Sequence, residues 1–512
     1  MAPATLAPRA RHIGDRDSLN MPPIPARASA WLTIAAIFCC ACGGETRRDS
    51  VEPLQVRIGV FGANQAGRPS AAQLADLLSA EPLVSVAWDG RPTLRLAEAA
   101  EDAADGLGIT ITLRSRMKFH NGEAVTAAAV RDLLLPKFPR QGVHEITDIR
   151  VLDGRTLHIA IREPYAFKTI DLSEFIVDDD AQPHLRTGPF RIVSSRRPVV
   201  LEPHDEYYLG TPRIRRVEIL EYPSQRAAWT AMMRGEVNFL HEVNRETIEF
   251  LEGSHIRTYP LLRPYYVPLA FNLRHPILQR QEVRVALNRA IDREEVVARG
   301  MAGRGRISEG PIWPHHWAYK QGRYAPPHDP EIARSLLDAA GLPAQRREGG
   351  MPSRFRFTCL ILEGDARFEQ IALVVQRQLF SVGIDMQLLP LSPRELVERI
   401  RAGNYEAFLF ELVTGRTLRL PYRFWHSQSG FVSTGYASAD AALDRMRLAR
   451  TDDETRTAVA EVMEVMQADP PAIFLAMPRE VRAADASLDI PYETDRDVFG
   501  SLWQATRAPA GE

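Results

Sequence analysis

Apolar positions along the chain follow two periods, which predict strands and helices in turn. Short runs that alternate or are continuously apolar indicate strands, and runs with apolar residues every three or four positions indicate helices. Val283, Leu287 and Ile291, for example, share one face of a predicted helix. The predicted strands include 56–61, 108–114, 156–161, 187–193, 199–202, 217–222, 236–240, 265–272, 355–362, 384–389, 405–412 and 472–477. Because strands and helices alternate, the pattern favours mixed α/β lobes over an all-helical bundle or a β-sandwich.

Capping residues predict where several helices begin. Thr126, Ser224, Asp329 and Ser392 each stand immediately before a predicted helix, and proline follows the last two. Their side-chain oxygens can accept from the free backbone N–H groups of a first turn, and proline fits the first helical position.

The most apolar stretch of the chain lies near its amino terminus. Residues 28–41 are almost entirely apolar and follow Arg27. At about 1.5 Å per residue they are too short to cross about 30 Å of hydrocarbon, but they suit the core of a signal peptide. The run ends in Ala41-Cys42-Gly43, which resembles the box of bacterial lipoproteins, in which the cysteine receives a diacylglycerol.

We therefore expect a signal peptide over 1–41, lipidation of Cys42 and a polar tether over 42–52. Met21 is the expected start, because a leader from Met21 has ordinary proportions. An uncleaved anchor or an ordinary signal peptide is the alternative.

Composition narrows the class of protein. Apolar residues make up 45% of the chain, as in ordinary globular proteins. The chain has 63 Lys and Arg against 65 Asp and Glu, a net charge of −2, without the basic excess of a nucleic-acid-binding protein. Beyond the leader Cys359 stands alone in an apolar run, so we expect a buried core thiol and no disulfide framework.

The common sequence signatures of catalysis are missing. There is no nucleophile elbow, no phosphate-binding Gly/Lys loop and no His-Glu-x-x-His pair. His315 and His316 are adjacent, so their side chains diverge on most backbones, and the glycine-rich stretch 300–305 follows a helix rather than a strand. We therefore expect that the protein is not an enzyme, that it uses no cofactor and that it has no metal site.

Four landmarks occur in a fixed order along the chain. They are 94–98 with 108–113 and 116–126, then 187–192 with 233–238, then 271–272 with 283–293, and finally 329–341. In these landmarks and their order the chain resembles the family 5 extracellular solute-binding proteins, the dipeptide-, oligopeptide- and nickel-binding components of ATP-driven importers.

The resemblance implies a fold of two α/β lobes that close like a clamshell, a periplasmic binding protein of class II (cluster C) type, with a small domain inserted in the first lobe. Lobe I would then comprise 53–80, 187–275 and 478–512, the inserted domain 81–186, and lobe II 276–477.

The resemblance also implies a function. A lipid-anchored protein at the periplasmic or extracytoplasmic face of a bacterium would enclose a small solute, peptide-like or other, and deliver it to the permease of an ABC importer. A sensor or chaperone-like binding module without transport is the alternative. A hydrolase with a dispersed active site is a third reading.

One departure from the family pattern concerns the solute. In peptide-binding members, the strand that Ala407–Leu412 resembles is followed by a Trp and by an Asp that pairs with the peptide's amino group. Here Arg416 and Arg419 follow the strand instead. Because a cationic amine would meet like charge there, we expect an acidic or neutral solute.

Candidate ligand-binding residues follow from the same comparison. The arginines are candidates for a carboxylate clamp or, equally, a solvated face. Phe271 and Asn272 lie at the expected crossover between the lobes. Aromatic residues could form flat walls, although core packing is the alternative for each; they are Trp88, Tyr265, Tyr266 and Trp425.

Overall fold

The computed structural model describes residues 53–62, 68–140, 145–179, 182, 184–243, 255–322, 324–345, 353–429 and 432–509. The chain divides into two units, Met1–Glu52 and Pro53–Glu512. The predicted signal peptide, Cys42 and the predicted tether lie outside the described residues. Across the described ranges, none of the helices combines the length and the apolar character that spanning a bilayer requires.

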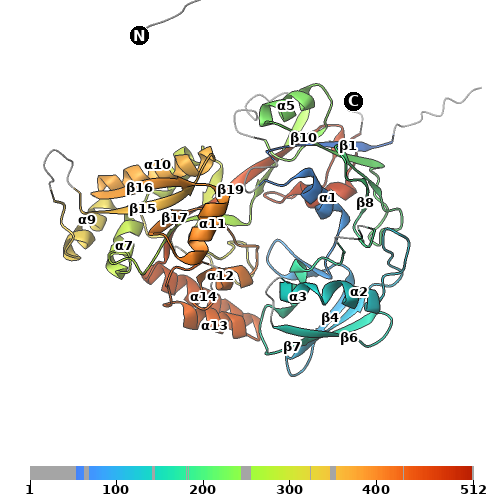
Figure 1. Ribbon diagram of the computed structural model, residues 1–512, viewed down its shortest axis with the longest axis horizontal. Coiled ribbons are helices and arrows are strands. Elements are labelled where there is room, and N and C mark those ends of the chain that lie inside the picture. Colours follow the sequence, from blue (N-terminus) through green and yellow to red (C-terminus); the bar gives the residue numbers. More distant parts are fainter. Residues whose placement is uncertain are drawn as a thin grey trace, which may run out of the picture. The chain divides into compact units, whose positions relative to one another are not determined.

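One continuous sheet path organises the second unit. Its strand order is β16-β15-β17-β13-β19-β11-β1-β10-β9-β8, with β12 and β14 paired to β19 and β18 paired to β13. Figure 1 shows the long strand β19 running between the two ends of this path. We call the elements on the β8 side the N-terminal region and those on the β16 side the C-terminal region.

The N-terminal region pairs β1 in parallel with β10 and β11, and β8, β9 and β10 form an antiparallel run. The apolar residues of β1 and of α1 pack together, because both elements present one apolar face. The elements are β1 Gln55–Phe61, α1 Ala71–Ser79, β8 Phe190–Ser194, β9 Val199–Pro203, β10 Arg216–Tyr222, α5 Gln225–Met233, β11 Phe239–Leu240 and β12 Ile256–Leu262.

A small antiparallel region lies between α1 and β8 in the sequence. Its sheet has the order β4-β5-β7-β6, and β2 and β3 form a separate hairpin. Its elements are β2 Val84–Val86, β3 Pro92–Leu94, β4 Ala97–Asp102, β5 Gly108–Leu113, α2 Ala127–Leu134, α3 Lys137–Arg140, β6 Ile146–Val151, β7 Thr156–Ile161, α4 Lys168–Asp171 and η1 Leu172–Glu174.

The C-terminal region combines parallel strands with covering helices, and β15 pairs in parallel with both β16 and β17. Its elements are β13 Tyr265–Phe271, α7 Gln281–Arg289, α8 Arg293–Glu295, η2 Val296–Gly300, β14 Gly305–Ile307, α9 Pro330–Ala339, β15 Phe355–Leu362, α10 Ala366–Ser381, β16 Ile384–Leu391, α11 Pro393–Ala402, β17 Ala407–Leu409, β18 Leu412–Val413, α12 Arg419–Trp425, α13 Asp440–Leu448 and α14 Asp452–Ala468. The chain then forms β19 Ala472–Asp485, β20 Leu488–Asp489, η3 Val498–Gln504 and β21 Thr506–Arg507.

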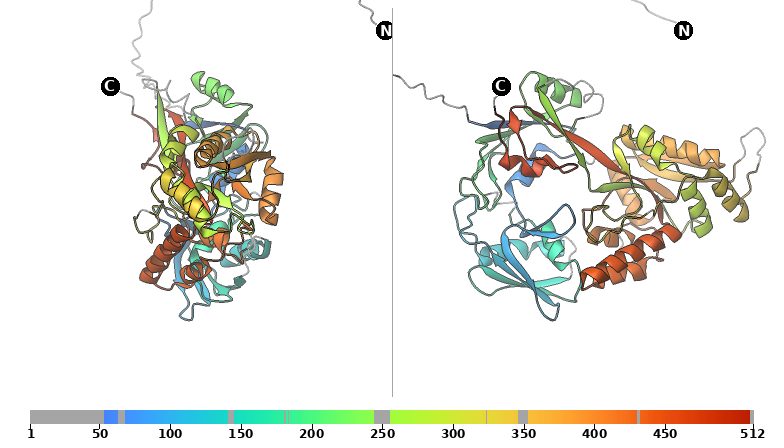
Figure 2. Two further views of the ribbon diagram at one scale, coloured as in Figure 1. Left: turned by 90° about the vertical axis from the view of Figure 1, so that its left-hand side faces the viewer. Right: turned by 180° about the vertical axis from the view of Figure 1, so that it is seen from behind.

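The small antiparallel region packs on the C-terminal region. Their buried apolar residues form one contiguous cluster, whereas those of the N-terminal region form two others. Arg447 at the end of α13 bonds to Glu163, and its carbonyl accepts from the N–H of Ala166. Figure 2 shows α13 and α14 beside the small sheet.

Local sequence signals hold well for the helix starts. The side chains of Thr126, Ser224, Asp329 and Ser392 accept from backbone N–H groups in the first turns of α2, α5, α9 and α11. Cys359 is fully buried on β15, as predicted.

Four strand predictions differ from the structure. The strand predicted over 405–412 forms two separate strands, β17 and β18, and the one predicted over 187–193 begins only at Phe190. The strand predicted over 472–477 continues to Asp485, because β19 changes partners along its length: Ala472–Ala476 pair with β13 and Arg479–Asp485 with β12. The charges of Glu480 and Arg482 hide this second half from an apolar pattern. In contrast, the strand predicted over 236–240 pairs only at Phe239 and Leu240.

Candidate functional site

A cavity of about 720 Å³ lies where β12, β13 and β19 meet. Strand β12 contributes Leu261 and Leu262, and the turn after it contributes Arg263. Glu480 and Arg482 come from the second half of β19. Because these strands also connect the N-terminal and C-terminal regions, the cavity lies at the crossing point of the whole sheet path.

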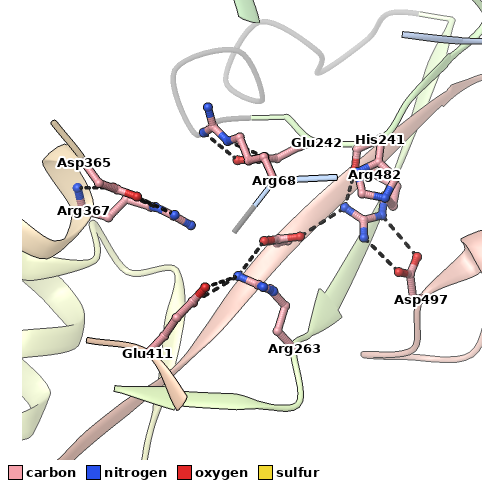
Figure 3. A network of polar contacts seen from close by, with 10 residues as sticks. Arg68, His241, Glu242, Arg263, Asp365, Arg367, Glu411, Arg482 and Asp497 are labelled. Carbon is pink, nitrogen blue, oxygen red and sulfur yellow. Dashed lines mark hydrogen bonds and ion pairs between the residues drawn. The ribbon is translucent and has the colours of Figure 1, made fainter. Parts of the chain in front are cut away.

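An ion-pair network is drawn in Figure 3, and most of its members line this cavity. Arg263 lies between two carboxylates, with Nη1 3.2 Å from Oε2 of Glu411 and 3.1 Å from Oε1 of Glu480. Arg482 continues the chain, 3.1 Å from Glu480 and 2.8 Å from Asp497. The network therefore joins β19, the β12–β13 turn, the segment before β18 and the start of η3.

Mutual attraction favours the charged forms of Arg263 and Asp497, whereas burial raises the pKa of Glu411. Although burial opposes the charge, Glu411 and Glu480 hold the pKa of Arg263 above its ordinary value. Burial alone would raise the pKa of Asp497, but Arg482 holds it below its usual range. In contrast, burial and the nearby Arg482 hold the pKa of His241 well below its ordinary value, so this imidazole faces the cavity uncharged at neutral pH.

Two further ion pairs flank the network, and Figure 3 shows both. Arg68 bonds to Glu242, with Nε 3.1 Å from Oε2. Arg367 bonds to Asp365 at the start of α10, with Nη2 2.6 Å from Oδ2. Arg68 and Glu242 also line the cavity.

Arg416 lies in the cavity with its backbone in the left-handed region, at a φ of 57°. Its N–H donates to Oγ1 of Thr414, whose own N–H donates to the carbonyl of Pro264 at 2.8 Å. Gly90, in the β2–β3 turn, lies so close that an added Cβ would come within 2.6 Å of the Arg416 carbonyl. The β12–β13 turn and the β2–β3 turn therefore fix this strained residue between them.

Trp88 and Tyr265 form apolar parts of the same cavity. The carbonyl of Trp88 accepts from Nε1 of Trp313 at 2.9 Å, and the two rings meet edge to face with centroids 5.0 Å apart. Arg263 lies over the ring of Tyr265, 4.0 Å from its centroid. Trp313 is completely buried and thus holds the partly buried ring of Trp88 in a fixed orientation.

The remaining residues predicted to bind ligand lie outside this cavity. Phe271 is fully buried at the end of β13, and Nδ2 of Asn272 donates to the carbonyls of Gly403 and Tyr405. Trp425 is buried in α12 and donates to the hydroxyl of buried Tyr266 at 2.9 Å. These contacts are those of core packing, and a ligand-binding role for these residues stays a prediction without a cavity to support it.

Arg419 lies apart from Arg416 although only two residues separate them. Its side chain bonds to Asp171 and Glu174 of the small antiparallel region. Of the predicted ligand-binding residues, the structure therefore brings three together in one cavity, Arg416, Tyr265 and Trp88.

A second cavity of about 780 Å³ lies in the C-terminal region, between α7 and residues 325–328. None of the predicted residues and no member of the ion-pair network lines it. Throughout the described ranges, no group of three or more His, Cys, Asp or Glu residues is arranged to hold a metal ion. The cavity at the strand crossing is thus the better candidate site.

Sequence reasoning missed the ion-pair network. Some of its members are separated by more than a hundred residues, as Arg263 and Glu411 are, so no spacing motif marks the network as a whole. One signal was available: Glu480 and Arg482 alternate with buried Val481 and Ala483, which indicates a strand with one charged face.

Three comparisons relate the chain to known proteins. The model of the bacterial extracellular solute-binding proteins, family 5 Middle, matches residues 91–432. The oligopeptide-binding protein AppA of Bacillus subtilis is 23% identical over 79% of this chain and 82% of its own length. The nickel-binding periplasmic protein of Escherichia coli is 24% identical over 67% of this chain and 70% of its own length. The crystal structure of NikA from Brucella suis in complex with Fe(III)-EDTA has a TM-score of 0.78 at 19% identity, covering 89% of this chain and all of that one.

Proposed function

Because the chain belongs to the family 5 bacterial extracellular solute-binding proteins, we propose that it captures a small solute in the cavity at the strand crossing and delivers it to an ABC-type importer. Proteins of this family bind solutes such as peptides and nickel outside the cytoplasm and are not enzymes. The observation that carries the proposal is the family match over residues 91–432 together with a cavity at the strands that join the two regions.

The cavity has properties suited to capture. A volume of about 720 Å³ lies within the range that encloses a small molecule. Its walls come from both regions and from the connecting strands, so a bound solute would touch all three and favour the closed arrangement. A permease could then distinguish the loaded protein from the empty one by its shape.

Attachment to a membrane is a further part of the proposal. Cys42 would carry the lipid, and residues 43–52 would connect it to the first strand, β1. The support is the Ala41-Cys42-Gly43 sequence at the end of the apolar run. A lipid anchor would keep the receptor near the importer and raise its effective concentration there.

The binding step can be tested without knowing the solute. The chain from Gly43 onward is incubated with a small-molecule extract of bacterial cells, separated from free compounds and denatured, and the released molecules are analysed by mass spectrometry. We expect one compound at close to one molecule per chain.

The test variant is Leu77→Trp: Leu77 borders the cavity and is itself 68% exposed, so a larger side chain there should narrow the cavity without disturbing a core. This variant should retain less of the compound. Deletion of the gene should abolish uptake of the same compound by the cell. If the unmodified chain retains nothing, or the variant retains as much, the proposed function is wrong.

A further inference from the structure

The carboxylates that line the cavity are all bonded to arginine. Glu242 bonds to Arg68, Asp76 to Arg186, Glu480 to both Arg263 and Arg482, and Asp497 to Arg482. A carboxylate already held by a guanidinium has little attraction left for a cationic ligand. These side chains therefore give the cavity polarity without giving it an anionic binding point.

Arg416 is the exception among the arginines of the cavity. Within the described residues no carboxylate lies within ion-pair distance of its guanidinium, whereas Arg68, Arg263 and Arg482 each have a carboxylate partner. The hydroxyl of Thr414 accepts from the backbone N–H of Arg416, and Gly90 lies close to its carbonyl, so both hold the backbone of Arg416 in place. A guanidinium without a carboxylate partner can bind an anion. Its planar N–H donors match the two oxygens of a carboxylate.

A second charge strengthens the same preference. Arg416 and Arg496 both lie 5.8 Å from the centroid of the Trp88 ring. The ring therefore already receives two cations, and a third on the ligand would compete with them and be repelled. Of these two arginines, Arg496 bonds to Glu493 at 2.7 Å. Arg416 is therefore the one whose guanidinium N–H groups can donate to a ligand.

The electrostatics of Arg416 agree with this geometry. Burial lowers the pKa of its guanidinium, Asp497 raises it and offsets part of this, and Arg496 lowers it again. An anion bound directly to the guanidinium would reverse that shift.

We propose that the solute carries a carboxylate that bonds to Arg416 and an apolar body that packs against Trp88 and Tyr265. This inference rests on the proposed function and names the class of its solute. The apolar part of the cavity supports the second half, because Leu74, Leu261, Leu262 and Phe499 also line it.

The test uses the chain from Gly43 onward with two kinds of probe. The first is the bacterial extract, whose retained compound is identified by mass. The second is a series of N-acetyl amino acids, their C-terminal amides and the corresponding amino-acid amides with a free amine, which present one body with negative, neutral or positive charge. Binding is measured by calorimetry for the unmodified chain, Arg416→Gln, Arg416→Lys and the control Arg334→Gln, whose side chain lies outside the cavity on α9.

We expect the retained compound to be a carboxylate, and within the series the acids to bind more tightly than the amides and amines. Arg416→Gln should weaken binding by about 30-fold or more, since it leaves a desolvated anion without its partner. The affinity of Arg416→Lys should lie between those of the unmodified chain and Arg416→Gln. The control Arg334→Gln should bind as tightly as the unmodified chain does. Circular dichroism and the thermal midpoint show whether each variant is folded. If Arg416→Gln does not fold, the binding measured for Arg416→Lys provides the test.

Two results would overturn the inference and leave the proposed function standing: a retained compound without a carboxylate, or acid binding that survives in both Arg416 variants. A chain that retains nothing from either probe would contradict the proposed function itself, and the inference with it.

Discussion

The guanidinium of Arg419, at the start of α12, bonds to the carboxylate of Asp171 at the end of α4, with Nε and Oδ1 2.9 Å apart. Asp171 is almost completely buried and also accepts from the hydroxyl of Tyr165 at 2.8 Å. The same guanidinium bonds to Glu174. Arg419 therefore joins the small antiparallel region to the C-terminal region.

We predict that Arg419→Gln weakens this junction. Burial raises the pKa of Asp171 to about 7 against the opposing attraction of Arg419, so at pH 8 the carboxylate is largely ionised and depends on its partner. Removal of one member of a buried pair costs about 3–5 kcal/mol, and we expect a cost of about this size here. Urea denaturation at pH 8 measures the change in the free energy of unfolding.

The control is Arg394→Gln, which breaks an exposed pair with Glu398 on α11 and should cost less than about 0.5 kcal/mol. Equal effects of the two substitutions would show that the Arg419 contact does not stabilise the fold.

Glu81 should make stability depend on pH. Its carboxyl is buried beside Tyr207 and Tyr208, and Tyr207 donates to Oε1 at 2.7 Å. Burial raises its pKa from 4.5 to about 7, and the bonds from the tyrosines only partly offset this. The folded state therefore binds the proton more tightly than the unfolded state, and the stabilisation present at low pH is lost as pH rises from about 4.5 to about 7.

Glu81→Gln should remove this dependence of stability on pH, because an amide does not titrate. Relative to the wild type, the variant should gain about 1–3 kcal/mol in the free energy of unfolding between pH 4.5 and pH 8. Denaturation at a series of pH values is the measurement, with exposed Glu398→Gln as the control that should leave the slope unchanged. If stability depends on pH as strongly in Glu81→Gln as in the wild type, other titrating groups cause that dependence.

Arg482 should be a major contributor to the stability of the strand crossing. Its side chain is 5% exposed and bonds to Glu480, Asp497 and the carbonyl of His241. We predict that Arg482→Gln lowers the free energy of unfolding by about 3–5 kcal/mol, because Asp497 loses its partner and Glu480 keeps only Arg263. Arg356→Gln breaks a partly exposed pair with Asp385 and should cost less than about 1 kcal/mol. A similar cost for both, measured by chemical denaturation, would contradict this.

Gly90 should control the position of Arg416. An added Cβ would approach the Arg416 carbonyl to 2.6 Å and a carbon of the His316 ring to 2.3 Å, and the backbone φ of 84° disfavours any side chain. We predict that Gly90→Ala weakens the binding of carboxylate probes by about tenfold or more, since displaced donors lose hydrogen-bond geometry.

Gly122→Ala is the matched control for Gly90. Gly122 has a similar φ of 87°, but nothing lies within 4 Å of an added Cβ. It should carry the same backbone cost, of about 1 kcal/mol, and leave binding unchanged. Calorimetry on both variants separates the effect of backbone strain at the glycine from the effect of displacing Arg416. Equal affinities of Gly90→Ala and Gly122→Ala for the carboxylate probes would exclude a positioning role for Gly90.

Cys42 should carry the membrane anchor. We predict that the mature wild-type chain begins at Cys42, has the mass of a diacylglycerol-modified protein and partitions into detergent. Cys42→Ser should remain unmodified, because serine lacks the thiolate nucleophile. Mass spectrometry of the intact membrane-fraction protein is the measurement. An unmodified wild-type chain in the soluble fraction would contradict the lipid anchor and leave the proposed solute binding untouched.

Short-range signals in the sequence determined the local structure and the family. A helix cap such as Thr126 or Asp329 acts through a bond to a backbone group three residues away, so the same few residues that encode it also form it. The ordered landmarks likewise identified the family, which the match over residues 91–432 confirms. The buried position of Cys359 followed from its apolar neighbours.

Only the tertiary structure decided which arginine faces the cavity. Arg416 and Arg419 follow the same strand and look equivalent in the sequence, yet Arg416 enters the cavity and Arg419 bonds to Asp171, which is far away along the chain. The left-handed backbone at Arg416 and the helix that begins at Arg419 turn the two side chains toward different regions. Whether a charge is neutralised depends on contacts between distant segments, and no local pattern of residues contains that information.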